Sequence, residues 1–170
     1  MRIFSILCAL FLVSAQTQAQ ASFTLNSVAF DNNAPLPLKY SGKGKDLSPP
    51  LAWQNPPAGT QSYALICDDP EAPSGTWTHW VLYSISSSVK NIAEGGENLP
   101  KNAILGKNSW GKTSYNGPNP PSGTHHYYFT LYALDAPLAL PSGLTSDQLQ
   151  QAMKDHILGK AILVGTFTKQ

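Results

Sequence analysis

The class of fold follows from residues 61–85, which read QSYALICDDPEAPSGTWTHWVLYSI. Two apolar segments enclose a short polar loop in this stretch. The first segment, 61–68, carries apolar side chains on both faces, with Tyr63 and Leu65 on one and Ala64 and Ile66 on the other. Successive side chains of a strand point to opposite faces, so this pattern predicts a strand that is covered on both sides, in the middle of a sheet.

Trp77 to Ile85 is a second predicted strand. Strict alternation places His79, Val81, Tyr83 and Ile85 on one face and Trp80, Leu82 and Ser84 on the other. We therefore expect His79 at the start of this strand, on the face that also carries Val81.

Glycine and proline divide the rest of the chain into further short segments typical of strands. The predicted strands are Phe23–Phe30, Pro35–Ser41, Leu51–Trp53, His125–Asp135 and Lys160–Thr168. A long irregular region separates the middle strands, at about residues 91–124. Its aromatic and apolar side chains, among them Trp110 and Tyr115, favour a packed, functional loop.

One helix is predicted near the C-terminus. Thr145 can serve as its N-cap with Gln148 three residues on, a capping box, and Gly159 can end it. Many strands with one late helix predict a mainly β fold, an antiparallel two-sheet β-sandwich with a few peripheral helices. At 170 residues the chain is expected to form a single domain, over residues 22–170.

The first 21 residues have the pattern of a secretory signal peptide. A positive start at Arg2 precedes an apolar run, Ile3–Val13, that is too short to cross a bilayer as a helix. Small-residue cleavage patterns then end at Ala19 and Ala21. We expect residues 1–21 to be removed, which leaves a periplasmic or secreted protein without a transmembrane segment.

The charge balance narrows the classes of partner. Lysine and arginine together number 11 and acidic residues 10, and Arg2 is the only arginine. No basic run occurs, which argues against nucleic acid as a partner. Without Arg2 the chain has no guanidinium group, so an anion site must use histidine, lysine, hydroxyl or backbone N–H groups. Cys67, the one cysteine outside the signal segment, is expected to be a buried core residue.

Two polar segments carry the candidate functional residues. The first holds Asp69 and Glu71, stiffened by the proline between them, and leads to His79. The second begins a strand at His125, and Tyr127 lies two residues on, so both side chains point the same way. A carboxylate that orients an imidazole, beside a phenol O–H, can bind a small anion.

Other interpretations of these residues stay open. Asp69 could simply cap a turn, with each histidine an ordinary strand residue. His79 and His125 could act as acid and base in a hydrolase or transferase, although no Gly-x-Ser-x-Gly motif supplies a nucleophile. The chain could also be a pure protein-interaction module. A metal site is not expected, because the ligand spacings His-x-x-x-His and Cys-x-x-Cys are missing.

Five segments stand out in order along the chain: LSPPLAW at 47–53, DPEAP at 69–73, THW at 78–80, GPNPP at 117–121 and HHYYFTLYALD at 125–135. Together they resemble the phosphatidylethanolamine-binding protein family, and in particular its bacterial Raf-kinase-inhibitor-like branch. The resemblance covers essentially the whole chain after the signal segment. It implies a sandwich of two antiparallel sheets with a small pocket at one end. In the family this pocket takes phosphate-like and carboxylate anions, including the phosphoethanolamine head group.

The matching motifs also imply which residues form that pocket. It would be lined by Asp69, Trp77, His79, Pro120, Pro121, His125 and Tyr127, with Glu71 and Pro73 supporting the loop. The chain departs from the family where His126 replaces the usual arginine, and where Glu71 replaces an aspartate. Alternation turns His126 away from His125, so we expect the pocket to be kept and an outward ion pair to be lost or to become pH-sensitive.

The sequence therefore predicts a non-catalytic exported protein that binds a small anionic ligand: phosphate, a carboxylate or a phosphoethanolamine head group. No cofactor is expected. The resemblance adds two further expectations, a protein target, since the family includes kinase and protease inhibitors, and a homodimer.

Overall fold

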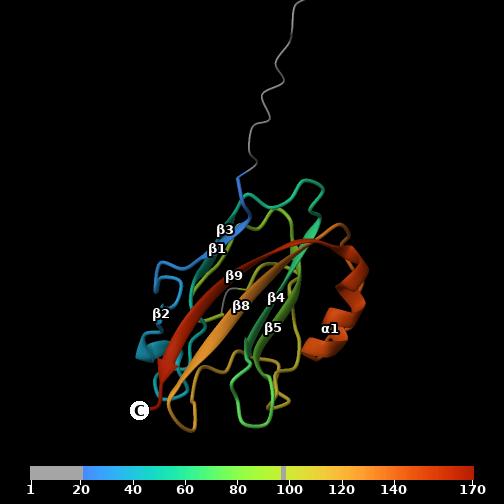
Figure 1. Cartoon of the computed structure of the whole chain (residues 1–170). Helices are drawn as coiled ribbons and strands as arrows, with labels where there is room; N and C mark the ends of the chain where they lie inside the picture. The colour runs from blue at the N-terminus through green and yellow to red at the C-terminus, as the bar shows by residue number, and fades with distance from the viewer. Residues whose placement is uncertain (1–20, 97–98) are drawn as a thin grey trace, which may run out of the picture.

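A six-stranded sheet forms the centre of the computed structural model, which describes residues 21–96 and 99–170 (Figure 1). Its strand order is β2-β9-β8-β4-β5-β7, and neighbours are antiparallel except for the short parallel pair of β2 with β9. The strands are β2 (Ala34–Pro35), β9 (Ile157–Thr168), β8 (Thr124–Leu134), β4 (Ser62–Asp69), β5 (Trp77–Ser86) and β7 (Ile104–Leu105). The predicted signal peptide, apart from Ala21, lies outside the described residues.

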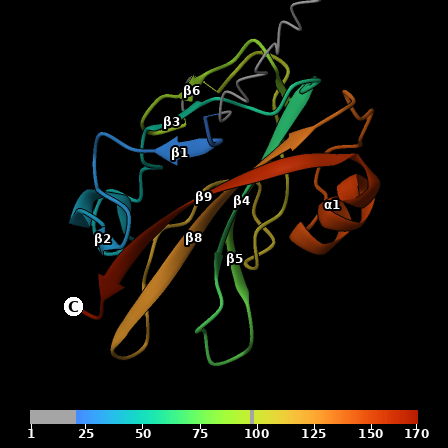
Figure 2. The same ribbon diagram turned by 45° about the horizontal axis from the view of Figure 1, so that its top comes forward.

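A smaller sheet and one helix cover the two faces of the large sheet (Figure 2). The small sheet has the order β1-β3-β6, with β1 (Thr24–Asn26), β3 (Leu51–Gln54) and β6 (Asn91–Ile92). Helix α1 (Ser146–Met153) lies on the other side. Leu25, Trp53 and Ile92 of the small sheet join the core between the sheets, and Leu149 and Met153 of α1 join a second core. The predicted two-sheet β-sandwich is confirmed.

The central position of β4 is confirmed as well. It pairs along most of its length with β5 on one side and β8 on the other. Leu65 and Cys67 face the core between the sheets, whereas Ala64 and Ile66 face the core under α1. Cys67 is buried and free, and burial raises the pKa of its thiol, so it is a core residue as predicted.

The N-terminal segments are less regular than predicted. Only Thr24–Asn26 of the predicted strand Phe23–Phe30 pairs with another strand. The predicted extended segment Pro35–Ser41 instead contains a 3₁₀ turn at Leu38–Tyr40. Both predictions overestimated strand length, because an apolar pattern shows which side chains are buried and not which backbone groups find a pairing partner.

The start of β5 departs from strict alternation. Thr78 and Trp80 are paired with consecutive residues of β4, and His79 between them has no partner on that strand. This β-bulge turns His79 toward the face of Trp80, where its ring contacts Tyr127, and away from the face of Val81. The prediction that His79 shares a face with Val81 was therefore wrong.

A second irregularity lies near the other end of β5. The register shifts opposite Ser84, whose φ of 57° is in the left-handed region. Ile85 consequently joins Leu82 in the core between the sheets, whereas alternation had placed it with Tyr83.

The helix begins as predicted but ends earlier. The Thr145 side chain accepts a hydrogen bond from the Gln148 backbone, and the Gln148 side chain accepts one from the Thr145 backbone, which completes the capping box. The α-helix ends at Met153, and a 3₁₀ turn (Lys154–His156) leads directly into β9. Gly159 is therefore a strand residue and does not end the helix. Within the described residues, no helix is long and apolar enough to cross a membrane.

Candidate functional site

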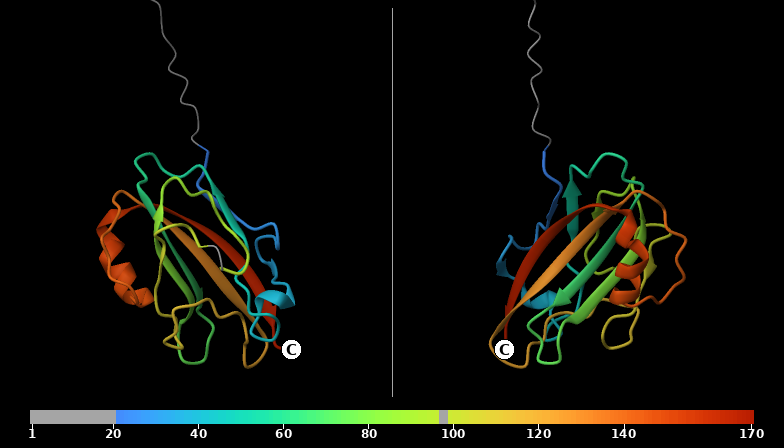
Figure 3. Two further views of the ribbon diagram at one scale, coloured as in Figure 1. Left: turned by 180° about the vertical axis from the view of Figure 1, so that it is seen from behind. Right: turned by 45° about the vertical axis from the view of Figure 1, so that its right-hand side comes forward.

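Two loops that are far apart in sequence lie at the same end of the large sheet. One is the turn between β4 and β5, residues 70–76, and the other is the long loop that leads into β8, residues 106–123. Both views of Figure 3 show these loops, in green and in gold, at the end where β9 also finishes.

The loops enclose a pocket of about 210 Å³, which we call the Asp69 pocket. Its wall comprises Asp69, Ala72, Pro73, Ser74, Trp77, His79, Trp110, Asn119, Pro120, Pro121 and Tyr127. Six of the seven residues predicted to line the pocket are in this wall, and so is Pro73, which was predicted to support it. The structure therefore brings the two predicted polar segments together.

Asp69 is held by N–H donors on both of its oxygens. The Nδ1 of His125 lies 2.7 Å from Oδ2, and the backbone N–H of Glu71 donates to Oδ1 at 2.9 Å. Asp69 is only 3 % exposed, and these bonds fix its orientation. His125 and Glu71 are outside the pocket wall. His125 was predicted to line the pocket; it contacts Asp69 of the wall, and its own role in ligand binding stays a prediction.

His79 is oriented by the loop opposite. Its Nδ1 lies 2.6 Å from the carbonyl oxygen of Asn116, so Nδ1 carries the proton and Nε2 is left for a ligand. Burial lowers the pKa of His79, which favours the neutral ring at neutral pH. The carboxylate of Asp46 accepts hydrogen bonds from the Asn116 side chain at 3.2 Å and from the Gly117 backbone at 2.5 Å, and so anchors this loop.

The Tyr127 hydroxyl is buried and has no hydrogen-bond partner among the described residues. Burial raises the pKa of this phenol, and the charge of Asp69 and a side-chain interaction with its carboxylate raise the pKa further, so the group stays a neutral O–H donor. The Tyr127 ring stands at right angles to the ring of His79, with centroids 5.1 Å apart.

Aromatic and proline side chains form the rest of the wall. Trp110 contacts Trp77 edge-on, with ring centroids 5.3 Å apart, and contacts His79 in the same way at 5.1 Å. Asn108 shapes the turn that carries Trp110, because its side-chain oxygen accepts the backbone N–H groups of Trp110 and Lys112 at 3.0 Å. The pocket is therefore mostly apolar, with a few fixed polar groups.

The side chains of His126 and Glu71 form an outward contact beside the pocket. Both the backbone N–H and the Nδ1 of His126 lie within reach of one Glu71 oxygen, at 2.6 and 3.0 Å. The bond from the His126 side chain is the main reason that the pKa of Glu71 is lowered. A contact is thus present at this position, and the call that the ion pair is lost or pH-sensitive stays a prediction.

Several residues of the site were not predicted. Ala72, Ser74 and Asn119 belong to the quoted motifs or to the loop between them, so their presence in the wall follows from their neighbours in sequence. Trp110 was noted only as a packed loop residue. Asn108 and Asp46 act through loop backbone, and no pattern in the sequence signals such a contact.

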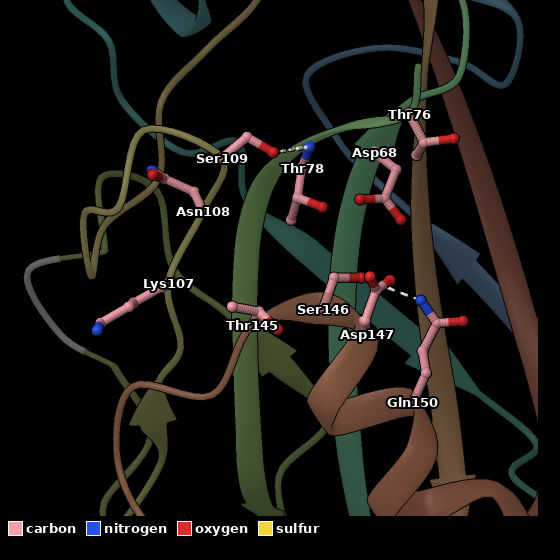
Figure 4. A pocket seen from close by; sticks show the side chains of 10 residues that line it. All are labelled: Asp68, Thr76, Thr78, Lys107, Asn108, Ser109, Thr145, Ser146, Asp147 and Gln150. Atoms are coloured by element: carbon pink, nitrogen blue, oxygen red, sulfur yellow. Dashed lines mark hydrogen bonds between the residues drawn. The ribbon is translucent and has the colours of Figure 1, made fainter. Parts of the chain in front are cut away.

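A second, larger cavity of about 440 Å³ lies near the start of α1, and we call it the Asp68 cavity (Figure 4). Figure 4 shows Asp68 and Thr78, from β4 and β5, facing Ser146 and Asp147 at the start of the helix. One Asp68 oxygen is buried without a partner among the described residues, and burial raises the pKa of Asp68 to about 6. Asp68 and Asp69, although adjacent, thus belong to different cavities.

The Asp69 pocket is the better candidate site, because the residues from both polar segments converge there. Its polar groups can orient and hydrogen-bond a small ligand, and its rings give it an apolar wall. Among the described residues, no group of three or more His, Cys, Asp or Glu side chains could hold a metal ion.

Comparison with known proteins assigns the family. The profile of the phosphatidylethanolamine-binding protein family matches residues 26–168, and the chain belongs to that family. A "UPF0098 protein" of Methanothermobacter thermautotrophicus is 42% identical over 149 residues, which cover 85% of this chain and 98% of that protein. A Mycobacterium tuberculosis relative named as a lipoprotein, LppC, is 42% identical over 159 residues, with 91% of this chain and 78% of that protein covered.

Solved structures agree with this assignment. The phosphatidylethanolamine-binding protein homologue CT736 of Chlamydia trachomatis is 40% identical and superposes with a TM-score of 0.82, covering 88% of this chain and 99% of that one. Escherichia coli YbcL, described as a member of the mammalian family, is 25% identical with a TM-score of 0.83 over 88% of this chain and 100% of that one. The resemblance seen in the sequence is confirmed.

Proposed function

We propose that the Asp69 pocket binds a small anionic group, such as phosphate, a carboxylate or the phosphoethanolamine head group. The observation that carries the proposal is the Tyr127 hydroxyl, which is buried in the pocket wall without a hydrogen-bond partner among the described residues. A buried donor without an acceptor is unfavourable, and a ligand oxygen would supply that acceptor. Nε2 of His79 can bond the ligand from the adjacent wall.

The protein is proposed to act by binding and not by turnover. In the hydrolase alternative, His79 and His125 would share the acid and base roles on one substrate. The geometry gives this alternative little support, because Nδ1 of His125 is bonded to Asp69 and His125 is not among the residues of the pocket wall. A screen for phosphoester hydrolysis would check the point, and turnover that is lost in His125→Ala would favour the enzyme.

Export is also part of the proposal. It rests on the signal-like pattern of residues 1–21 and on the relative that is named as a lipoprotein. Fractionation of expressing cells, with the N-terminus of the product read by mass spectrometry, should find the chain outside the cytoplasm and beginning near residue 20 or 22.

A protein target would, on this proposal, dock at or beside the pocket. Co-purification from the cell envelope should recover the partner with the wild-type chain and lose it with His79→Ala. Recovery with both would favour a pure interaction module. Sedimentation would test the expected homodimer.

The direct test of the pocket is a titration of the histidine side chains by NMR. Phosphate, acetate or phosphoethanolamine at millimolar concentration should shift the imidazole signals of His79 and His125 in a saturable way. His156 serves as an internal reference, because it pairs with Asp135 beyond the opposite end of β8. The absence of saturable shifts at His79 would contradict the proposal.

Two variants make this test specific. His79→Ala should abolish binding, because it removes both the imidazole nitrogen and the edge contact with Tyr127. His156→Ala is the matched control, and its binding should equal that of the wild type.

A further inference from the structure

The loop before β8 contains a chemically labile pair of residues, Asn116 and Gly117, which is the one Asn-Gly sequence in the chain. Every other asparagine is followed by a residue that has a side chain. Asparagine is thermally labile, because its side-chain amide can react with the backbone nitrogen that follows it. A following glycine has no Cβ and hinders this approach least. By its neighbour in sequence, Asn116 is therefore the asparagine most open to deamidation.

The deamidation of Asn116 has two steps. The backbone nitrogen of Gly117 bonds to Cγ of Asn116 and loses its proton, while the bond from Cγ to Nδ2 breaks, so that ammonia leaves and a cyclic imide remains. Water then opens the imide at one of its carbonyl carbons, which gives aspartate or isoaspartate. The first step requires that the Gly117 nitrogen give up its proton and that the Asn116 side chain rotate until Cγ meets that nitrogen.

Hydrogen bonds in the folded chain oppose both requirements. Oδ1 of Asp46 accepts the backbone N–H of Gly117 at 2.5 Å, and Oδ2 accepts from Nδ2 of Asn116 at 3.2 Å. The attacking nitrogen and the leaving nitrogen are thus both bonded to one side chain. The Asn116 side-chain oxygen also accepts from Asn108 at 2.7 Å and from Ser114 at 3.1 Å, so the amide is held against rotation.

The backbone at Gly117 is closely packed as well. Gly117 is buried, and a Cβ added to it would lie 2.1 Å from the carbonyl oxygen of Tyr40. The next residue, Pro118, accepts a hydrogen bond from the Gly42 backbone at 2.9 Å. The main chain therefore has to open locally before the imide can form, and the free energy of this opening slows the reaction.

A change at Asn116 would reach His79 directly. The carbonyl oxygen of Asn116 lies 2.6 Å from Nδ1 of His79 and orients its ring. If the product is aspartate, an oxygen takes the place of Nδ2, and the bond to Asp46 becomes a contact between two acceptors. If the product is isoaspartate, the main chain runs through Cγ and gains a methylene, which displaces the carbonyl from His79. Either product loosens the contact that orients the ring.

We propose that Asn116–Gly117 is a deamidation site that Asp46 protects in the folded chain, and that its conversion releases the ring of His79. The site would give the ordered loop a finite lifetime after synthesis. Both effects are properties of the chain without a ligand, so they are tested separately from anion binding.

Protection is tested by mass spectrometry of the peptide that contains residue 116, after incubation in mildly alkaline buffer. The folded wild-type chain should convert at least about tenfold more slowly than the same chain unfolded in urea, because several hydrogen bonds must open first. Equal rates in the folded and unfolded chain would overturn the protection.

Two variants test the part of Asp46, whose φ of 58° is also open to asparagine and glycine. Asp46→Asn keeps one acceptor oxygen and should convert at least about threefold faster than the wild type, since at least one bond is lost. Asp46→Gly removes both acceptors and should convert about tenfold faster or more. Unchanged or slower conversion in both variants would overturn the role of Asp46.

Two control variants separate loss of these bonds from other effects, and an amide NMR spectrum checks that every variant folds. Asp155→Asn changes an exposed acid, and Leu149→Val weakens the core under α1, away from the loop. Both should convert at nearly the wild-type rate. If Leu149→Val converts as fast as Asp46→Gly, global unfolding controls the reaction and the protection by Asp46 is overturned.

Release of His79 is tested with Asn116→Asp, which mimics one product. In the wild type, the Nδ1 proton of His79 should give an NMR signal that exchanges slowly with water, because the ring is buried and bonded to the Asn116 carbonyl. We expect this signal to be lost in Asn116→Asp and in wild-type chain aged to conversion. Asn91→Asp, the same change at an exposed position of β6, should keep it. A slowly exchanging signal in both Asn116→Asp and the aged chain would overturn the release of His79.

Discussion

At the scale of single residues, Tyr127 and Asp69 differ in how many hydrogen bonds their side chains make within the protein. Asp69 has a partner on each oxygen, whereas the Tyr127 hydroxyl has none among the described residues. In the folded chain, the Asp69 carboxylate accepts hydrogen bonds from the protein, whereas the Tyr127 hydroxyl donates none to a described residue. A buried donor without a partner is unfavourable, and a group from outside the chain would supply the missing acceptor.

Tyr127→Phe should therefore weaken binding without weakening the fold. We expect the affinity for phosphate to fall about fivefold to tenfold, about 1 kcal/mol, because one hydrogen bond is lost. The melting temperature should stay equal or rise slightly, since no partner within the protein is abandoned. Calorimetry and thermal denaturation measure the two quantities.

Tyr128→Phe is the matched control for this prediction. It also removes one tyrosine hydroxyl, but from the next residue of β8, whose side chain points to the opposite face. Phosphate affinity should not change in this variant. Equal weakening in both variants would mean that the hydroxyl of Tyr127 does not contact the ligand.

At the scale of elements, the site depends on two loops that are tied to strands. The first residues of β8 hold the turn between β4 and β5, with His125 bonded to Asp69 and His126 to Glu71. The loop before β8 in turn holds His79 through Asn116. Each loop is thus oriented by contacts with elements remote in sequence.

The His126 contact predicts an observable change in titration. The imidazole of His126 is the main cause of the lowered pKa of Glu71, so this pairing adds stability above the usual pKa of a glutamate and loses it as pH falls through the lowered value. In His126→Ala the pKa of Glu71 should rise toward its ordinary value. Carbon-detected NMR of the carboxyl group measures it. His156→Ala should leave Glu71 unchanged.

Gly117→Ala should disturb the loop that orients His79. An added Cβ would lie 2.1 Å from the carbonyl oxygen of Tyr40, so backbone has to move. We expect a loss of about 1–3 kcal/mol in the free energy of unfolding, together with weaker phosphate binding. Urea denaturation and calorimetry measure these effects.

Gly42→Ala is a suitable control in the adjoining segment. Its Cβ would meet its neighbours at 3.5 Å or more, an ordinary contact, and its φ is not in the left-handed region. Stability and binding should stay near the wild-type values. A Gly117→Ala variant as stable as this control would contradict the proposed packing.

The elements that the sequence predicted well are those whose signals are local. Alternation of apolar residues placed β4, and the Thr145 capping box placed the start of α1. The bulge at His79 has no local signal, because it results from pairing with β4, and so alternation assigned the wrong face. The bond between His125 and Asp69 likewise joins two strands that are distant in sequence.

At the scale of the whole molecule, the family and the sandwich were predicted because several motifs occur in order over one chain. The enclosing wall was predicted less completely, since Trp110 reaches the pocket only through the path of a long loop. The Asp68 cavity was not predicted at all. It arises where α1 packs over the large sheet, and sequence patterns do not show how two elements meet.

Asp68 predicts how global stability depends on pH. Burial raises its pKa from 3.8 to about 6, so between these values the folded chain keeps a proton that the unfolded chain releases. The contribution of Asp68 to the free energy of unfolding is thus most favourable below about pH 4, and it falls as pH rises to about 6. Asp68→Asn should raise the free energy of unfolding at pH 7.5 by about 1–3 kcal/mol, and by less at pH 4.5.

Urea denaturation at the two pH values measures this difference. Asp155→Asn, which changes an exposed carboxylate, should have little effect at either pH. If Asp68→Asn stabilises the chain equally at both pH values, the raised pKa is not the cause.

The bulge at His79 separates β5 into two stretches whose alternation is out of phase. Before the bulge, the side chains of Trp77 and His79 line the pocket. After it, alternation resumes from Trp80 and is interrupted again opposite Ser84. We therefore expect a substitution at Trp77 or His79 to leave unchanged which side chains from Val81 onward are buried. Ligand preference can drift in such a strand while the packing of the sandwich stays fixed.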